Sequence, residues 1–168
     1  KEPQPEEFEL LNSDHVLFGY LHLASNLSLT KILLEKKLTG IATEMIMSGK
    51  EYPLLMPMSQ IAGNLAIQKG MQFLEYSSKG KGLLLSSISG KKNSKVTVIG
   101  CGEVGRSSIH KSIQIGASVT AIDINEDILN ELKDQYGENI TTLVSGSDSA
   151  INEIRSADLV VGAVLLPG

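Results

Sequence analysis

Short apolar runs in the second half of the chain alternate with segments of helical periodicity. The runs at 95–99, 117–123, 140–144 and 158–165 have the length of strands, and we expect the last to be buried on both faces. A helical pattern separates each run from the next. Because strands that alternate with helices pair in parallel, this order predicts an α/β domain with a parallel sheet.

A smaller pattern of the same kind occupies the first half of the chain. After a short helical pattern near Phe8, the apolar run 16–21 is expected to be a buried strand, and residues 40–44 a second strand. Between them, Asn26 or Ser28 is placed to cap a helix. The order strand, helix, strand predicts part of a second α/β unit.

A longer helical pattern connects the two halves. It opens at Pro57 with Ser59 as the expected N-cap, and continues to about Tyr76. Residues 77–94 are rich in Gly, Ser and Lys, which predicts a loop with one short strand or turn. We therefore expect three parts, with boundaries at 1–57, 58–78 and 79–168.

The run at 95–99 leads directly into Gly-Cys-Gly-Glu-Val-Gly, which has the spacing GxGxxG. Gly100 permits the tight turn, Gly102 lets a pyrophosphate approach the backbone, and Gly105 lets the next helix pack close to the sheet. The start of that helix offers unpaired N–H groups and the positive end of its dipole to phosphates. This pattern predicts a Rossmann dinucleotide site. The alternative is an ordinary tight turn between a strand and a helix.

An acidic residue, Asp123, ends the next strand. A carboxylate at this position accepts hydrogen bonds from ribose hydroxyls and repels the 2′-phosphate of NADP, and no arginine follows in 124–126. The sequence therefore favours NAD as the cofactor, and the alternative is a surface acid at the end of a strand. Ligands bind beyond the carboxyl ends of parallel strands, where Ser145 and the pair Val164 and Leu165 also fall.

Composition limits the possible partners. The chain has 168 residues, 42% of them hydrophobic, and a net charge of −4, as in an ordinary soluble protein. It has no basic stripe, so we expect no nucleic-acid partner. The longest apolar run, 159–166, is too short for a membrane span of about 20 residues, and we assign no metal ligands. The single cysteine, Cys101, fits a reducing, cytoplasmic compartment and is expected to be a small residue of the glycine turn rather than a redox group.

Several strings resemble the alanine dehydrogenase family, which is related to the NAD-binding subunit of proton-translocating transhydrogenase. They are Lys1–Pro3, Leu17–Ala24, Pro53–Gly63, the glycine turn, Asp123–Asn125 and Ala157–Gly168. The resemblance implies reversible, NAD-dependent oxidative deamination of L-alanine to pyruvate and ammonia by a homohexamer. It also implies a partial Rossmann doubly wound parallel sheet, preceded by part of a catalytic α/β domain and joined to it by an interdomain helix.

The resemblance gives individual residues a role. His22 matches the catalytic acid/base, and an imidazole can donate or accept a proton near neutral pH. Lys1 matches a lysine that binds the substrate carboxylate or carbonyl oxygen. Positions that bind the cofactor are matched by Ser59, Glu103, Val104, Ser145, Val164 and Leu165. From the residues alone the alternatives stay open: a partly buried histidine, a surface lysine, and a simple helix cap at Ser59.

The chain also departs from the family pattern. The family's substrate-binding arginine and a later catalytic aspartate have no counterpart in it, so we expect an internal segment of a longer enzyme that is inactive alone. Family members usually have a loop with glycine and proline before the nucleotide strand, whereas residues 86–92 of this chain contain one glycine and no proline. The alternative function is a non-catalytic NAD-binding module of a transhydrogenase, in which the histidine matched by His22 is absent.

Overall fold

The computed structural model describes residues 2–49, 51–86 and 93–164. The chain divides into two compact units, Lys1–Met58 and Ser59–Gly168, and each has its own hydrophobic core. The strands of both units pair in parallel, which confirms the predicted α/β class. The expected three-part division of the chain stays a prediction.

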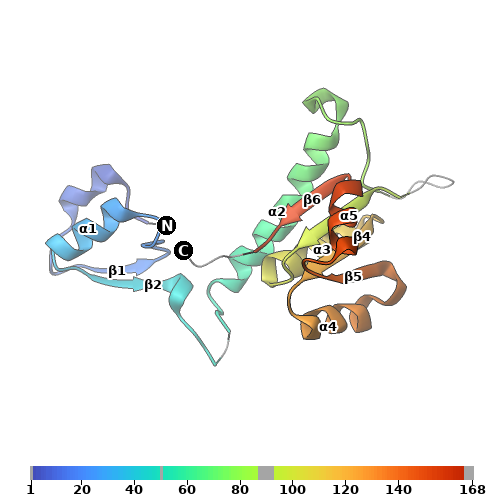
Figure 1. Ribbon diagram of the computed structural model, residues 1–168. Helices are drawn as coiled ribbons and strands as arrows, with labels where there is room; N and C mark the ends of the chain where they lie inside the picture. The colour runs from blue at the N-terminus through green and yellow to red at the C-terminus, as the bar shows by residue number, and fades with distance from the viewer. Residues whose placement is uncertain (1, 50, 87–92, 165–168) are drawn as a thin grey trace. The chain divides into compact units, whose positions relative to one another are not determined.

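The first unit contains a pair of parallel strands joined through a helix (Figure 1). They are β1 (Val16–Gly19), β2 (Thr39–Ala42) and α1 (Leu27–Glu35). Short 3₁₀ helices at Pro5–Leu10 and Thr43–Met45 precede β1 and follow β2. The side chain of Asn26 accepts a hydrogen bond of 3.1 Å from the N–H of Leu29, so Asn26 rather than Ser28 caps α1.

The prediction of a buried strand over 16–21 was wrong in its length and its burial. β1 ends at Gly19, and the side chains of Val16 and Phe18 are 61% and 65% exposed. The helix covers one side of this small sheet, so alternate side chains of β1 face away from the core. The buried residue is Leu21, just beyond the strand, and it packs with Leu29 and Leu33 of α1.

The second unit is built on a parallel sheet whose described strands number four, in the order β5 (Ile140–Val144), β4 (Ser118–Asp123), β3 (Lys95–Ile99), β6 (Leu159–Gly162). The chain moves outward from β3 to β5 and then returns to place β6 on the other side of β3. That crossover is the predicted doubly wound arrangement.

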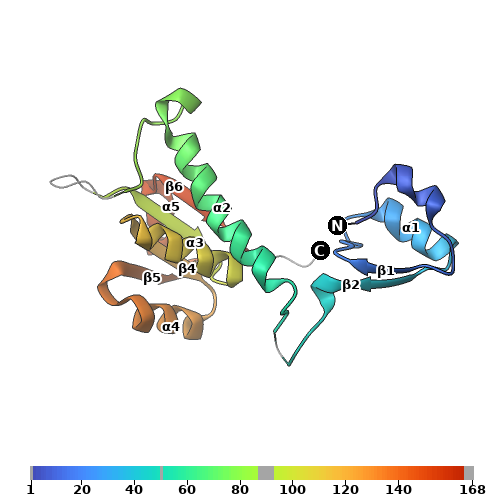
Figure 2. The ribbon, with the colours of Figure 1, turned by 180° about the vertical axis from the view of Figure 1, so that it is seen from behind.

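Helices cover both faces of this sheet. The helices are α2 (Met56–Leu74), α3 (Glu103–Gln114), α4 (Glu126–Tyr136) and α5 (Asp148–Ser156). Figure 2 shows α2 and α3 in front of the sheet, and the opposite view in Figure 1 shows α5 in front. Val96 and Val98 of β3 are fully buried and belong to one core with Ile67 of α2 and Ile109 of α3.

Helix α2 begins at Met56, so the expectation that Ser59 is its N-cap was wrong. The N–H of Met56 donates to the carbonyl oxygen of Tyr52 at 2.9 Å, and the turn thus formed continues as the helix. Pro57 is tolerated in the first turn because the N–H that proline lacks would have no intrahelical partner there. Ser59 therefore lies inside the helix.

The edge strand β6 also differs from its prediction. It ends at Gly162, and Val160 is 42% exposed whereas Val161 is 7% exposed. Val161 belongs to the core that α2 and α3 cover, and Val160 points to the opposite face, so the strand is not buried on both sides. In the predicted loop at 77–94, the described residues contain a 3₁₀ turn at Tyr76–Ser78 and no strand, and residues 87–92 lie outside the described ranges.

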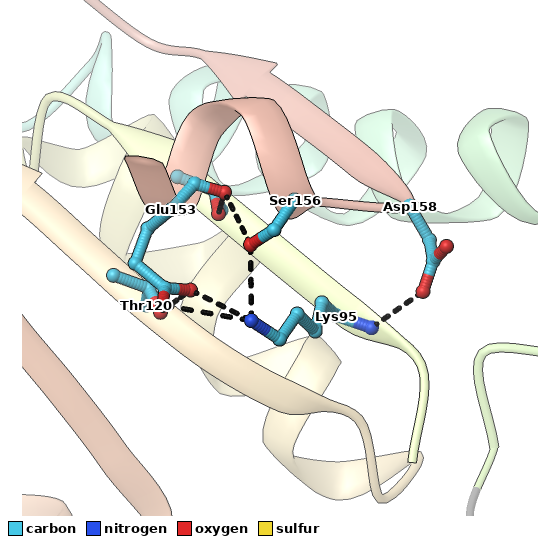
Figure 3. A network of polar contacts seen from close by, with 6 residues as sticks. Lys95, Thr120, Glu153, Ser156 and Asp158 are labelled. Atoms are coloured by element: carbon cyan, nitrogen blue, oxygen red, sulfur yellow. Dashed lines mark hydrogen bonds and ion pairs between the residues drawn. The ribbon is translucent and has the colours of Figure 1, made fainter. Parts of the chain in front are cut away.

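Polar contacts hold the amino ends of the strands to α5 (Figure 3). The amino group of Lys95 lies 3.0 Å from Oγ of Ser156 and 3.3 Å from Oε2 of Glu153. The backbone N–H of Lys95 donates to Oδ2 of Asp158 at 2.9 Å. These contacts fix β3 and β6 at the end of the sheet opposite the edge where ligands bind.

Candidate cofactor site

A cavity of about 710 Å³ opens at the carboxyl ends of the strands in the second unit. Ile99 ends β3, Asp123 ends β4, and Ser145 and Val164 follow β5 and β6. Ser59 reaches the same cavity from the first turn of α2. The volume lies in the range of about 300–1,000 Å³ that is typical of small-molecule sites.

Residues of the glycine turn line this cavity. Gly100 has a φ of +89°, a backbone conformation that favours glycine. A Cβ atom at Gly105 would overlap the carbonyl oxygen of Gly100, whereas one at Gly102 would meet nothing within 4 Å. The turn and packing roles expected of Gly100 and Gly105 are therefore present, and Gly102 leaves open space beside the cavity.

The start of α3 offers hydrogen-bond donors at the same place. Gly102 is the N-cap residue and supplies no side chain to satisfy the first N–H groups of the helix, which have no intrahelical acceptor. These groups and the positive end of the helix dipole attract anions. Glu103, at the first helical position, is exposed. The open space at Gly102 and this set of donors fit a dinucleotide pyrophosphate.

Asp123 connects the end of β4 to the glycine turn. Its Oδ2 accepts a hydrogen bond of 2.6 Å from the N–H of Cys101, and its Oδ1 accepts one of 2.9 Å from the N–H of Asn125. Each carboxylate oxygen has a second lone pair, so the group can still accept hydrogen bonds from ribose hydroxyls. Asp123 lines the cavity in a position that fits this use.

Cys101 is fully buried within the turn. Burial, together with the negative charge of Asp123, raises the pKa of its thiol to about 12, and the charge of Arg106 acts in the opposite direction. A thiol with such a pKa is protonated at neutral pH and is a poor nucleophile. The structure thus agrees with the expectation of a small packed residue rather than a redox group.

A second polar cluster lies in the first unit, just beyond the ends of β1 and β2. His22 is exposed and has a φ of +49°. The rings of Tyr20 and His22 lie nearly parallel, with centroids 6.2 Å apart. The carboxylate of Glu44 accepts a hydrogen bond of 2.7 Å from the backbone N–H of His22. The histidine is therefore held by its backbone and presents its side chain to solvent.

Comparison with known families covers nearly the whole chain. Residues 1–62 match the family described as "Alanine dehydrogenase/PNT, N-terminal domain", and residues 66–168 match "Alanine dehydrogenase/PNT, C-terminal domain". This chain belongs to the alanine dehydrogenase/PNT family. The predicted resemblance is confirmed, and membership implies a nicotinamide nucleotide as cofactor.

Curated relatives of this chain are named alanine dehydrogenase. The chain is 45% identical to the alanine dehydrogenase of Methanococcus maripaludis and 45% identical to that of Bacillus subtilis, in each case over 100% of its own length. It covers 45% and 44% of those proteins, so it spans less than half the length of these curated relatives.

Solved structures of two related proteins also match nearly the whole chain. An L-alanine dehydrogenase is 41% identical, with a TM-score of 0.89 over 99% of this chain and 46% of that one. A transhydrogenase from Sinorhizobium meliloti is 20% identical, with a TM-score of 0.75 over 99% of this chain and 48% of that one. At that identity the second likeness shows the fold alone.

The cavity brings together most of the residues predicted to bind the cofactor, namely Ser59, Gly100, Gly102, Glu103, Val104, Asp123, Ser145 and Val164. Gly105 lies buried beneath the turn and does not line the cavity. His22 belongs to the first unit, and Lys1 and Leu165 lie outside the described residues. The functional roles of all these residues stay predictions. No helix within the described ranges is long and apolar enough to cross a membrane.

Some residues of the two clusters were not predicted. The cavity is also lined by Ile99, Cys101, Ile122, Ile124 and Ala163. Each is a chain neighbour of a predicted residue, so the strand-end rule that selected Asp123 could have found them. In the first unit, Tyr20 and Glu44 were missed. The available signal for Glu44 was its place at the end of the second predicted strand, since parallel strands end at the same edge.

Proposed function

We propose that this chain is part of an enzyme that oxidises L-alanine to pyruvate and ammonia with NAD. The observation that carries the proposal is the similarity over the full chain to alanine dehydrogenases at 44–45% identity. The cavity at the strand ends supports it, because its size and donors suit a dinucleotide.

The choice of NAD over NADP rests on Asp123. This carboxylate lines the cavity and is held by two backbone N–H groups. A fixed negative charge at the end of β4 accepts hydrogen bonds from the ribose hydroxyls of NAD and repels the additional phosphate of NADP. The residue after it, Ile124, offers no positive charge to offset that repulsion.

The remaining cavity residues hold the dinucleotide in this proposal. The first N–H groups of α3, at Glu103 and Val104, bind the pyrophosphate, and Gly102 provides the space for it. Ser59, Ser145 and Val164 bind the nucleoside portions, and the family resemblance gives Leu165 the same role. When bound, NAD supplies the acceptor for the hydride that leaves the α-carbon of alanine.

We assign proton transfer to His22 and substrate binding to Lys1. Oxidation of the amine and attack of water on the resulting imine both require a base for a proton, and imidazole serves in that role near neutral pH. The exposure of His22 leaves its ring open to a substrate. Lys1 would neutralise the carboxylate of alanine and so align its α-carbon.

The family resemblance extends the proposal to a homohexamer in the cytoplasm. The buried free thiol of Cys101 is compatible with a reducing compartment. Sedimentation of the full-length protein tests the oligomeric state: a mass near six subunits supports the proposal, and a stable monomer or dimer contradicts it.

A transhydrogenase module is the second candidate, because the S. meliloti transhydrogenase shares the fold. The exposed histidine in a constrained loop favours the dehydrogenase, since a module that only carries NAD has no use for a proton donor at that position. Flanking coding sequence that continues into membrane-spanning segments would favour the transhydrogenase.

The decisive experiment measures alanine-dependent reduction of NAD by the full-length protein and its His22→Ala variant. We expect turnover in the wild type and a loss of about 100-fold or more in the variant, with NAD affinity almost unchanged. His15→Ala, at an exposed histidine of the same unit, is the matched control and retains activity. Undiminished turnover in His22→Ala contradicts the assignment.

A further inference from the structure

We propose that Glu44 is a positioning residue for His22, and that its carboxylate fixes the backbone conformation from which the imidazole is presented. This inference rests on the proposed function, because the reaction it serves is the proton transfer assigned to His22. Glu44 contacts His22 through the backbone and acts through it rather than on the reacting atoms.

The contacts come from the chain segments that leave the two parallel strands. β1 and β2 are paired up to Gly19 and Ala42, and their regular hydrogen bonding ends there. Beyond this point, Oε1 of Glu44 accepts hydrogen bonds from the N–H of Leu21 at 3.2 Å and from the N–H of His22 at 2.7 Å. The side chain thus provides the acceptor that a longer β2 would have provided with its backbone.

The conformation that Glu44 stabilises is unfavourable for histidine. A φ of +49° places His22 in the left-handed region, which strains a non-glycine residue, and residues strained in this way cluster at functional sites. Its carbonyl oxygen is held as well, by the N–H of Ser25 at 3.0 Å and by Oγ of Ser25 at 3.1 Å. The peptide on each side of His22 is therefore fixed by a hydrogen bond.

Neighbouring residues restrain the same loop. Leu21 is 1% exposed and anchors the loop in the core of the first unit. The ring of Tyr20 lies beside that of His22, at an interplanar angle of 18°, and the hydroxyl of Tyr20 donates to the carbonyl oxygen of Leu54. These contacts limit where the imidazole can lie, and Glu44 determines the backbone from which it extends.

The charge of Glu44 strengthens its hydrogen bonds. Burial by itself raises the pKa of this carboxyl group, but hydrogen bonds from the backbone N–H groups of Glu44, His22 and Leu21, and the nearby charge of His22, lower it below its ordinary value. The group is therefore ionised at neutral pH. Hydrogen bonds to an ionised acceptor are roughly twice as strong as neutral ones.

The test compares three variants in the full-length protein. Glu44→Ala removes the acceptor. Glu44→Gln keeps one oxygen in the place of Oε1, which accepts from both N–H groups, and loses only the longer contact of 3.3 Å from the N–H of Leu21 to Oε2. Glu35→Ala, at an exposed carboxylate of α1, is the matched control. We expect kcat to fall about 10- to 100-fold in Glu44→Ala, and about fivefold or less in Glu44→Gln, with NAD affinity unchanged in all three.

A double variant separates positioning from general destabilisation. If Glu44 acts through His22, then adding Glu44→Ala to His22→Ala lowers kcat by less than about twofold more. A full additional loss in the double variant, or a Glu44→Gln variant as impaired as Glu44→Ala, overturns the proposal. So does a Glu44→Ala variant with wild-type kcat.

The outcomes also distinguish this inference from the proposed function. Wild-type turnover in His22→Ala contradicts the proposed function, whatever Glu44 does. Loss of turnover in His22→Ala together with wild-type turnover in Glu44→Ala contradicts only the positioning role. An NMR measurement of the backbone amide of His22 supports the kinetics: its resonance shifts in Glu44→Ala and is retained in Glu44→Gln, and an unchanged resonance in Glu44→Ala overturns the contact itself.

Discussion

The backbone N–H of Cys101 donates a hydrogen bond of 2.6 Å to Oδ2 of Asp123, and this bond joins the glycine turn to the end of the neighbouring strand. The other oxygen of Asp123 is held by the N–H of Asn125. A single carboxylate therefore holds the glycine turn in place and presents a charge to the cavity. The two functions cannot be changed separately by mutating this residue.

Asp123→Asn is expected to weaken NAD binding without creating an NADP site. An amide has one acceptor oxygen, so its NH₂ group would face one of the two backbone donors that now bind the carboxylate. Loss of a hydrogen bond to a charged group costs about 1.5–3 kcal/mol, which predicts a decrease in NAD affinity of about 10- to 100-fold. Calorimetric titration with each dinucleotide measures this.

Asp134→Asn is the matched control, because Asp134 is an exposed carboxylate on α4, away from the cavity. Its NAD affinity is expected to stay within about twofold of the wild type. An Asp123→Asn variant that binds NADP as tightly as the wild type binds NAD would show that the carboxylate acts by repulsion alone.

Cys101 is expected to resist alkylation in the folded protein. With a pKa of about 12 the thiol is almost entirely protonated at pH 8, whereas an unfolded cysteine with a pKa of about 8.5 is substantially ionised. Iodoacetamide should therefore label the native chain at least about 100-fold more slowly than the chain in urea, as measured by mass spectrometry. Equal rates in the two states would mean that the glycine turn opens readily.

Features determined by local sequence were predictable. The spacing of Gly100, Gly102 and Gly105 located the cavity. The turn needs the positive φ of Gly100, and a Cβ atom at Gly105 would overlap the carbonyl oxygen of Gly100. Asn125, a residue type typical of the N-cap, directly precedes α4, and its side chain accepts a hydrogen bond of 3.0 Å from the N–H of Asp127. Both features depend on short stretches of chain, so one sequence is enough to find them.

Features determined by packing were not predictable. An apolar run predicts a strand, but which of its side chains are buried depends on whether a helix covers each face, as the exposed Phe18 and Val160 show. The left-handed backbone of His22 depends on Glu44, a residue distant in sequence that approaches only because β1 and β2 pair. Histidine occurs at positive φ more often than most residues with a side chain, but nothing near His22 in the sequence selects this conformation.

The stabilising contribution of Glu44 is expected to depend on pH. The pKa of its carboxyl group is lower in the folded state than its ordinary value of about 4.3, so the folded state holds the proton less tightly. Its contribution is therefore fully present above that ordinary value and is lost as the pH falls through the lowered one. Urea unfolding of the wild type and Glu44→Gln between about pH 3 and 6 should show a difference in the free energy of unfolding that shrinks with acidification. A difference that is constant over this range would contradict the pKa assignment.

Gly63→Ala is expected to destabilise the second unit and to weaken NAD binding. Gly63 lies where α2 packs on the start of α3, and Oγ of Ser108 donates to its carbonyl oxygen at 3.1 Å. A Cβ atom there would overlap the carbonyl oxygen of Val104 and lie 2.7 Å from Cβ of Ser107, so the helices must separate. Overpacking of this kind costs about 1–3 kcal/mol, which urea unfolding measures. NAD binding weakens as well, because the displaced Val104 lines the cavity.

Gly162→Ala is the control, because a Cβ atom at that position meets nothing within 4 Å. Equal stability of the two variants, within about 0.5 kcal/mol, would show that α2 does not pack closely on α3.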